Sequence, residues 1–332
     1  MAQTPKTPKK NAVVNVAFRH LEDFGARGTK VVSGAKLDEL VSLCVTRAVS
    51  ALERDVSSYA SKQRDQISDV FKSLLSTHRT IRKLLKEYAH GNPEAVDALS
   101  LLRLQLEGLF VACLMLEAPK YVDLYVGDYW KKTYIDYLLI KEESGALPSQ
   151  QDYLATSLPN IINLRNYFGL TEEHQATIEL EQLGTPIPVG LTNQPIPWFP
   201  TPGDVPKEIV NPDKKRMLER LKFRYDQLCS FSHVLGHANL LKAVFDKRFV
   251  HRNAGRIREE DVKEKFQRVV VIPATLESCL CITQAATELT MLYPNDLDLA
   301  AIAIETWNSI ADTSSLCHIV WALRAKKMLG IV

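Results

Sequence analysis

The stretch that decides the fold is residues 67–88, ISDVFKSLLSTHRTIRKLLKEY. Its apolar residues recur every three or four positions, with polar and charged residues between them. They are Ile67, Val70, Phe71, Leu74, Leu75, Ile81, Leu84, Leu85 and Tyr88. This period is that of an α-helix with one buried face, and the pattern extends back to Leu37. The sequence therefore predicts one very long helix, or two in tandem, beginning near Lys36.

The next segments repeat the helical pattern behind clear stops and starts. Gly91 suits a helix end, Asn92 can cap the next helix and Pro93 fits its first turn, so that helix is predicted over 93–117. Pro119 begins another helix, whose aromatic residues recur at three- and four-residue intervals and are interpreted as core or interface. They are Tyr121, Tyr125, Tyr129, Trp130, Tyr134 and Tyr137.

The rest of the chain is predicted to be helical as well, with one interruption at Pro273. The apolar segment around this proline favours a helix that is perturbed or restarted there, with a brief strand as the alternative. Further helices are predicted over 149–168, over 171–183 with Thr171 as cap, from Asn211 and Pro212 onward, and behind caps at Asn295 and within 312–314.

A proline-rich segment, residues 184–211, breaks the helical pattern. It holds seven prolines between Pro186 and Pro206, and proline removes backbone donors and favours extended chain. We therefore expect no helix here, but a strap that is anchored by Trp198 and Phe199 and covers the core, or a lid over a site. A second irregular segment, the basic loop 246–258, separates two of the later helices.

These patterns predict an all-α fold, a multi-helix and mostly antiparallel bundle with a proline-rich strap. Residues 1–35 are expected to form a basic, mobile tail and an N-terminal segment without assigned structure. Residues 36–332 are expected to form a single helical domain.

Composition narrows the class of protein. The chain has 332 residues, of which 46% are hydrophobic and 24% charged, as in ordinary globular proteins. Its formal net charge of +2 gives no overall attraction to nucleic acid or to an anionic membrane. An apolar leader and an uncharged apolar run of membrane-spanning length are both missing from the sequence, which favours a cytoplasmic protein with no membrane partner.

The cysteines and the common motifs also exclude several classes of site. The six cysteines lie within apolar segments without a CxxC pair, so we expect reduced, buried thiols. The phosphate-binding patterns GxGxxG and GxxxxGK[ST] are absent, as are HExxH and GxSxG. Standard nucleotide-binding and hydrolase folds are therefore excluded as first interpretations.

One candidate site remains, formed by two segments distant in sequence. Arg103 and Glu107 stand four residues apart in the apolar run LLRLQLEGLF, hence on one helical face. Charges in such a run need partners, because burying an unpaired ion costs several kcal/mol. The partners are expected to be each other or a polar group on a facing helix, for which His233 is the first candidate, with Tyr225 and Ser232 nearby.

A second histidine raises the alternative of a metal site. His233 and His237, in CSFSHVLGHANLL, would share a face if a helix continued through Gly236. A zinc site needs a third protein ligand, and the segment supplies none at the spacing of HExxH. We therefore predict no metal and no cofactor, and interpret His237 and Trp198 as further ligand-binding candidates.

The segments LRLQLEGLFVACLML and RYDQLCSFSHVLGHANLL together resemble the Arg-x-x-x-Glu helix and the Tyr-x-x-x-Ser-x-x-His helix of an uncharacterised all-helical bacterial domain family. The similarity covers about residues 70–290. It implies a shared polar site at Arg103, Glu107, His233 and either Ser230 or Ser232. It implies no particular activity.

The chain is more distantly similar to HEPN-type helical domains, whose ribonuclease members use an Arg followed after four to six residues by a His. Here Arg224 precedes His233 with eight residues between them, so that motif is not reproduced. A composite site could still pair His233 as general base with Arg103 as stabiliser of a pentavalent phosphate.

Two functions follow as hypotheses. The first is a cytoplasmic, non-catalytic helical protein that binds a partner protein or a polar ligand through Arg103, Glu107 and His233. The second is a metal-independent ribonuclease, or a related phosphoryl-transfer enzyme of a bacterial defence or toxin system, with RNA as substrate and His233 as base. Dimerisation of two copies through the long helices is a further expectation, because their amphipathic length exceeds what a small core needs.

Overall fold

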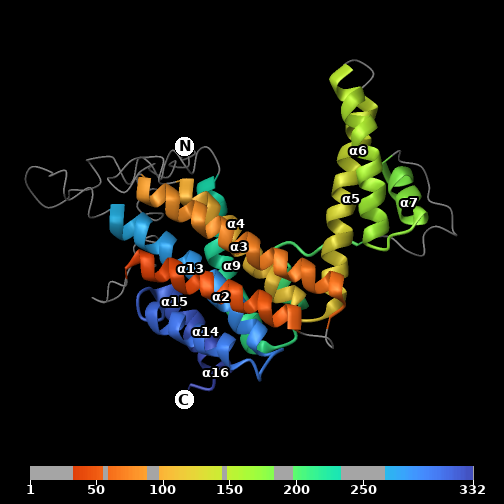
Figure 1. The fold of residues 1–332 in the computed structure, drawn as a ribbon. Helices are drawn as coiled ribbons and strands as arrows, with labels where there is room; N and C mark the ends of the chain where they lie inside the picture. The colour runs from red at the N-terminus through yellow and green to blue at the C-terminus, as the bar shows by residue number, and fades with distance from the viewer. Residues whose placement is uncertain are drawn as a thin grey trace, which may run out of the picture. The chain divides into compact units, whose positions relative to one another are not determined.

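The computed structural model describes residues 33–54, 59–87, 97–143, 148–182, 197–232 and 266–331. Helices account for 85% of this part of the chain, and no strand occurs in it. The predicted all-α class is therefore confirmed (Figure 1). The main helices are α2 (Gly34–Arg54), α3 (Ser61–Glu87), α4 (Asp97–Met115), α5 (Pro119–Glu143), α6 (Pro148–Tyr167), α7 (Glu172–Gln182), α9 (Pro212–Ser232), α13 (Ile272–Thr290) and α14 (Leu297–Ile310).

The chain forms two compact units. The first comprises the residues up to Leu116 together with those from Pro202 onward, and the second comprises Glu117–Thr201. The single domain predicted over 36–332 is not tested by this grouping alone, and it stays a prediction.

Side-chain contacts show that neighbouring helices of the first unit run antiparallel, because they join the start of one helix to the end of the next. Tyr59, just before α3, donates a hydrogen bond of 3.0 Å to the backbone oxygen of Met115 at the end of α4. Lys214, in the first turn of α9, donates at 2.8 Å to the oxygen of Cys113, also near the end of α4. Asp38 at the start of α2 likewise pairs with Arg82 near the end of α3. The long amphipathic segment is thus two helices in tandem.

Helix α13 lies within the core of this unit. Every residue from Pro273 to Thr290 is buried. The turn before it, Gln267–Val271, is a π-helix that continues directly into α13, in which Pro273 is the second residue. Proline lacks the N–H that would continue the regular hydrogen-bond pattern, so the helix is perturbed at this point. The prediction of a helix perturbed near Pro273 is confirmed, and the alternative of a strand is wrong.

Helix starts follow capping side chains. The Asn211 side-chain oxygen accepts hydrogen bonds from the backbone N–H groups of Asp213 and Lys214, at the helix start that was predicted there. Ser314 accepts one from Cys317, which confirms the cap predicted within 312–314. Before α14 the cap is Asp296, which accepts from Leu299, and the predicted cap Asn295 is wrong by one residue.

The second unit has its own core of aromatic and aliphatic side chains. Trp130, Tyr134 and Tyr137 of α5 are buried against Ile161 of α6 and Ile178 of α7. The Trp130 indole donates a hydrogen bond of 3.0 Å to the oxygen of Ile161. The aromatic stripe is therefore mainly core, as interpreted, although Tyr129 is exposed.

The proline-rich segment is described from residue 197 onward. Phe199 packs edge-to-face on Tyr125, with ring centroids 5.2 Å apart, as expected of an anchor. Trp198 is 54% exposed and covers Lys131, whose Nζ lies 4.3 Å from its ring centroid. The expectation that 184–211 contains no helix is wrong, because α8 (Val205–Glu208) forms a single turn with Pro206 in its first positions. The basic loop 246–258 lies outside the described residues.

Two further properties bear on the class of protein. Among the described helices, α4 is long and apolar enough to span a membrane, but 61% of its apolar window is buried, as in core helices of soluble proteins. All six cysteines are free. Five are buried, as predicted, but the prediction is wrong for Cys229, which is only partly buried. Burial raises the pKa of the Cys44 and Cys317 thiols to about 12, so both stay protonated at neutral pH.

Candidate functional site

The two predicted charges on α4 form an ion pair. The Nη2 atom of Arg103 lies 3.8 Å from Oε1 of Glu107, one helical turn away. Their side chains are 34% and 31% exposed, so neither is fully buried. The spacing prediction is correct, and the exposure leaves the pair open to a ligand.

Helix α9 adds Tyr225 to this pair. Its hydroxyl donates a hydrogen bond of 2.6 Å to Oε1 of Glu107, the same oxygen that faces Arg103. Its ring packs edge-to-face on Phe110, with centroids 6.2 Å apart. The Asn211 cap and the bond from Lys214 to Cys113 hold α9 against α4 in the register that brings these groups together.

The surroundings fix the protonation of both partners of Glu107. Burial raises the pKa of Tyr225, and the hydrogen bond to Glu107 and the Cys229 thiol raise it further. Tyr225 is therefore a donor at neutral pH and cannot act as a base. Burial works to lower the pKa of Arg103, but Glu107 and Cys229 outweigh it and the pKa is raised, so Arg103 stays charged.

Cys229 belongs to the site but was not expected there. It stands four residues after Tyr225, hence on the same face of α9, and its thiol lies beside both Arg103 and Tyr225. It is half-buried, unlike the other five cysteines. The four-residue spacing from Tyr225 was the signal in the sequence that could have identified it.

A buried ion pair supports the site from behind. Arg224, next to Tyr225, donates through Nε to Oε2 of Glu277 on α13 at 2.9 Å, and the two side chains are 1% and 0% exposed. Burial raises the pKa of Glu277, while Arg224 acts to lower it. Removing one partner would leave a buried charge alone, so this pair fixes the position of α9 on the core.

The remaining predicted residues are not brought into this cluster by the described structure. His233 and His237 lie outside the described residues, and Ser232 is the last residue of α9. Trp198 belongs to the second unit, where it contacts Lys131 and Lys132. Within the described residues no group of three His, Cys, Asp or Glu side chains could hold a metal ion.

A second polar site was missed altogether. A cavity of about 400 Å³ is lined by Asp38 of α2 and by four basic residues of α3. The four are Arg79, Arg82, Lys83 and Lys86, and their spacing of three and four residues was the available signal.

Comparison with known proteins adds no assignment, because no protein-family model, curated protein or solved structure matches the chain. The suggested similarity to the all-helical bacterial family and to HEPN-type domains stays a hypothesis. The function is therefore argued from the site itself.

Proposed function

We propose that the chain is a non-catalytic, cytoplasmic protein that binds a small polar ligand at Arg103, Glu107 and Tyr225. One observation carries the proposal: a single carboxylate oxygen of Glu107 accepts from Tyr225 and faces Arg103. The second oxygen, Oε2, makes no hydrogen bond with any described residue. A ligand donor can bind there, while the guanidinium offers donors to a ligand acceptor.

The charges indicate the class of ligand. Arg103 and Glu107 lie within 4 Å, so their charges largely offset each other and the site attracts neither strong anions nor strong cations. A molecule that carries a donor and an acceptor a few ångströms apart, such as a zwitterionic amino acid, can satisfy both. Partial exposure of both side chains makes the groups accessible without unfolding.

The ribonuclease hypothesis has one observation in its favour. Arg103 lies beside Cys229 in the last turn of α9, and His233 follows this helix directly in the sequence. Against it, Glu107 already pairs with Arg103, and its carboxylate would repel a phosphate brought to the guanidinium. We therefore prefer binding to phosphoryl transfer.

Thermal melting with a panel of free amino acids tests the proposal. At least one should raise the melting temperature of the wild-type protein, and Arg103→Gln and Glu107→Gln should each weaken its apparent affinity by about tenfold or more. Tyr225→Phe keeps the ring against Phe110 but removes the donor, so we expect a smaller loss. Tyr129→Phe, at an exposed position, is the matched control and should behave as wild type.

The same proteins separate the two hypotheses. Incubation of wild type and His233→Ala with mixed cellular RNA, with and without chelator, should show no cleavage by either. Chelator-insensitive cleavage by wild type alone would establish the nuclease instead. A melting temperature that no amino acid raises in the wild type, or that an amino acid raises as much in Arg103→Gln and Glu107→Gln as in the wild type, would rule out this ligand site.

A further inference from the structure

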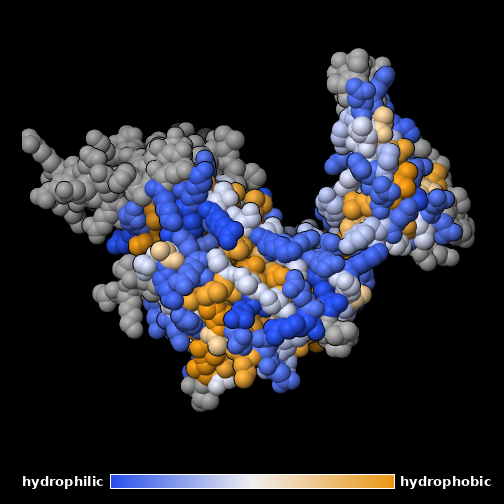
Figure 2. All heavy atoms as spheres, viewed as in Figure 1, coloured by the Kyte–Doolittle hydropathy of each residue, from blue (hydrophilic) through white to orange (hydrophobic). Residues whose placement is uncertain are grey.

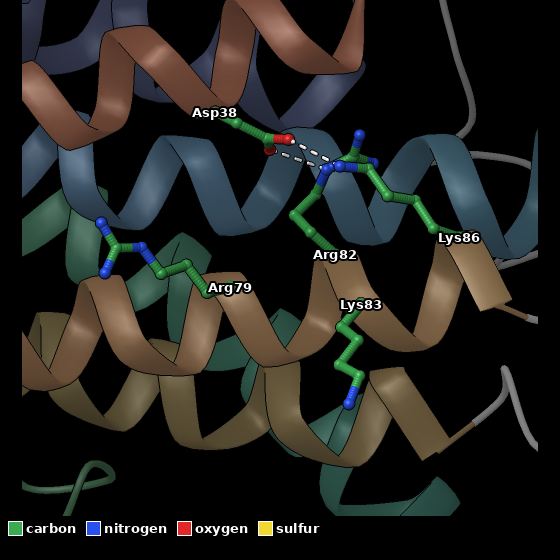
Figure 3. Close-up of a pocket in the computed structure, with 5 residues that line it drawn as sticks. All are labelled: Asp38, Arg79, Arg82, Lys83 and Lys86. Carbon is green, nitrogen blue, oxygen red and sulfur yellow. Dashed lines mark hydrogen bonds and ion pairs between the residues drawn. The ribbon is translucent and has the colours of Figure 1, made fainter.

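The cavity between α2 and α3 combines one acid with four bases. Its lining consists of Asp38 and the α3 residues Arg79, Arg82, Lys83 and Lys86. The four bases lie on adjacent turns of α3, so all of them face the same side of that helix. Figure 3 shows Arg82 and Lys86 converging on Asp38, while Arg79 and Lys83 extend away from that group.

Asp38 does not cancel this positive charge. Its Oδ1 atom accepts hydrogen bonds from Nε of Arg82 at 2.8 Å and pairs with Nε2 of His78 at 3.2 Å, while Oδ2 accepts from Lys86 at 3.3 Å. Burial works to raise the pKa of Asp38, but the hydrogen bond from His78 and the charge of Arg82 lower it to about 2. The carboxylate is thus ionised and already occupied.

Arg82 is held rigidly in the cavity wall. Its Nη1 atom donates at 2.8 Å to the hydroxyl of Thr275 on α13, in addition to the bond to Asp38. Nη2 lies against Gly34, where a Cβ atom would approach it to 1.9 Å. A glycine at the first position of α2 is therefore required for this placement of the guanidinium, which is ordered before any ligand arrives.

One outer base, Arg79, supplies charge that no described contact of the fold uses. Arg79 makes no hydrogen bond or ion pair with any described residue, and Arg79, Lys83 and Lys86 are exposed. On the face shown in Figure 2, hydrophilic residues gather over α3, whereas hydrophobic ones gather around α14 and the C-terminal helix α16 (Lys326–Met328). The start of α2 adds its partial positive charge to the same region.

We propose that this cavity binds a small soluble molecule that carries a phosphate or pyrophosphate group. A purely solvated basic stripe would need neither a hollow in the surface nor an arginine fixed by Asp38, Thr275 and a glycine contact. A cavity of about 400 Å³ falls within the size range of small-ligand sites. Arg82 provides a preorganised donor, and Arg79 and Lys83 provide charge at its margin. This site is separate from the one at Arg103 and does not depend on it.

Inorganic pyrophosphate is the probe, measured by isothermal titration calorimetry on the full chain. Wild type should bind it at about 20 mM NaCl and more weakly at about 300 mM NaCl. Arg79→Gln, which breaks no described contact, should weaken binding about fivefold or more. Gly34→Ala changes no charge but displaces Arg82, so it should also weaken binding. Lys72→Gln removes an exposed base of the same helix outside the cavity, and binding should stay within about twofold of wild type.

The outcomes distinguish a specific phosphate-binding site from non-specific attraction of anions to the basic residues of α3. Equal losses in Arg79→Gln and Lys72→Gln, or no binding by wild type at low salt, would overturn the proposal. Orthophosphate and glycerol phosphate, run in parallel, should compete with pyrophosphate. Binding to phosphatidic acid vesicles without binding of free pyrophosphate would assign the phosphate to a lipid headgroup and refute a soluble ligand. Because none of these variants touches Arg103 or Glu107, failure here leaves the amino-acid test unaffected.

Discussion

Among single residues, Asp38 gives the clearest pH dependence. Its pKa in the folded protein is about 2, below its ordinary value of 3.8. Since the folded pKa is lowered, the stabilisation is complete above about pH 4 and disappears as the pH falls towards 2. The shift corresponds to about 2 kcal/mol. We predict that Asp38→Asn lowers the free energy of unfolding by about this amount at pH 7, measured by urea denaturation.

The difference in the free energy of unfolding between wild type and Asp38→Asn should narrow as the pH falls from 4 to 3. Asp69→Asn is the control, because Asp69 is an exposed carboxylate of α3 whose described ion pair, with Lys72, lies at the surface. It should change stability little at any pH. If the difference in the free energy of unfolding between wild type and Asp38→Asn stayed constant from pH 7 to pH 3, the ion pairs of Asp38 would not be its cause.

Residue-level predictions succeeded where the signal was local. Arg103 and Glu107 were paired correctly because a four-residue spacing fixes their proximity on any helix. Tyr225 was placed near them from its position in the second motif. Asp38 and Arg82 were not, because 44 residues separate them and only the antiparallel packing of α2 on α3 brings them together.

Among the helices, boundaries were predictable where proline or a capping side chain marks them. Pro119 and the pair Asn211 and Pro212 were read correctly because fixed φ and a side-chain acceptor suit a first turn. The same rule explains the error at α8, where Pro206 starts a helical turn within a segment taken to be wholly extended. Proline-rich composition excludes helix interiors, not helix starts.

Asn211 gives a test of capping at the start of α9. Its Oδ1 atom accepts from the N–H groups of Asp213 and Lys214, and from Nη1 of Arg324 at 3.0 Å. Asn211→Ala removes all three bonds, so it should lower the free energy of unfolding by about 1–2 kcal/mol. Urea denaturation would measure the change. Asn211→Asp keeps the acceptor and should stay near wild type, whereas an equal loss in both variants would show that capping is not the cause.

On the scale of the whole molecule, the central position of α13 was hidden in the sequence. Its buried face carries Glu277, Thr283 and Glu288, which composition alone would assign to a surface. They are buried because other helices supply partners: Arg224 for Glu277, and Arg324 and Lys214 for Glu288. Such compensation depends on tertiary packing, and no local pattern records it.

The two units have separate cores, each built around a fully buried tryptophan. Trp130 donates to Ile161 in the second unit, and Trp307 donates at 3.0 Å to the hydroxyl of Thr287 in the first. Truncating either to alanine should cost about 3–5 kcal/mol. If the units unfold independently, Trp130→Ala lowers the midpoint temperature of only one calorimetric transition and leaves the hydrogen-exchange protection of α13 unchanged. Trp307→Ala then lowers the midpoint temperature of the other transition. A single transition that both variants lower alike would instead support one cooperative domain over 36–332, because destabilisation of either core would then be shared by the entire chain.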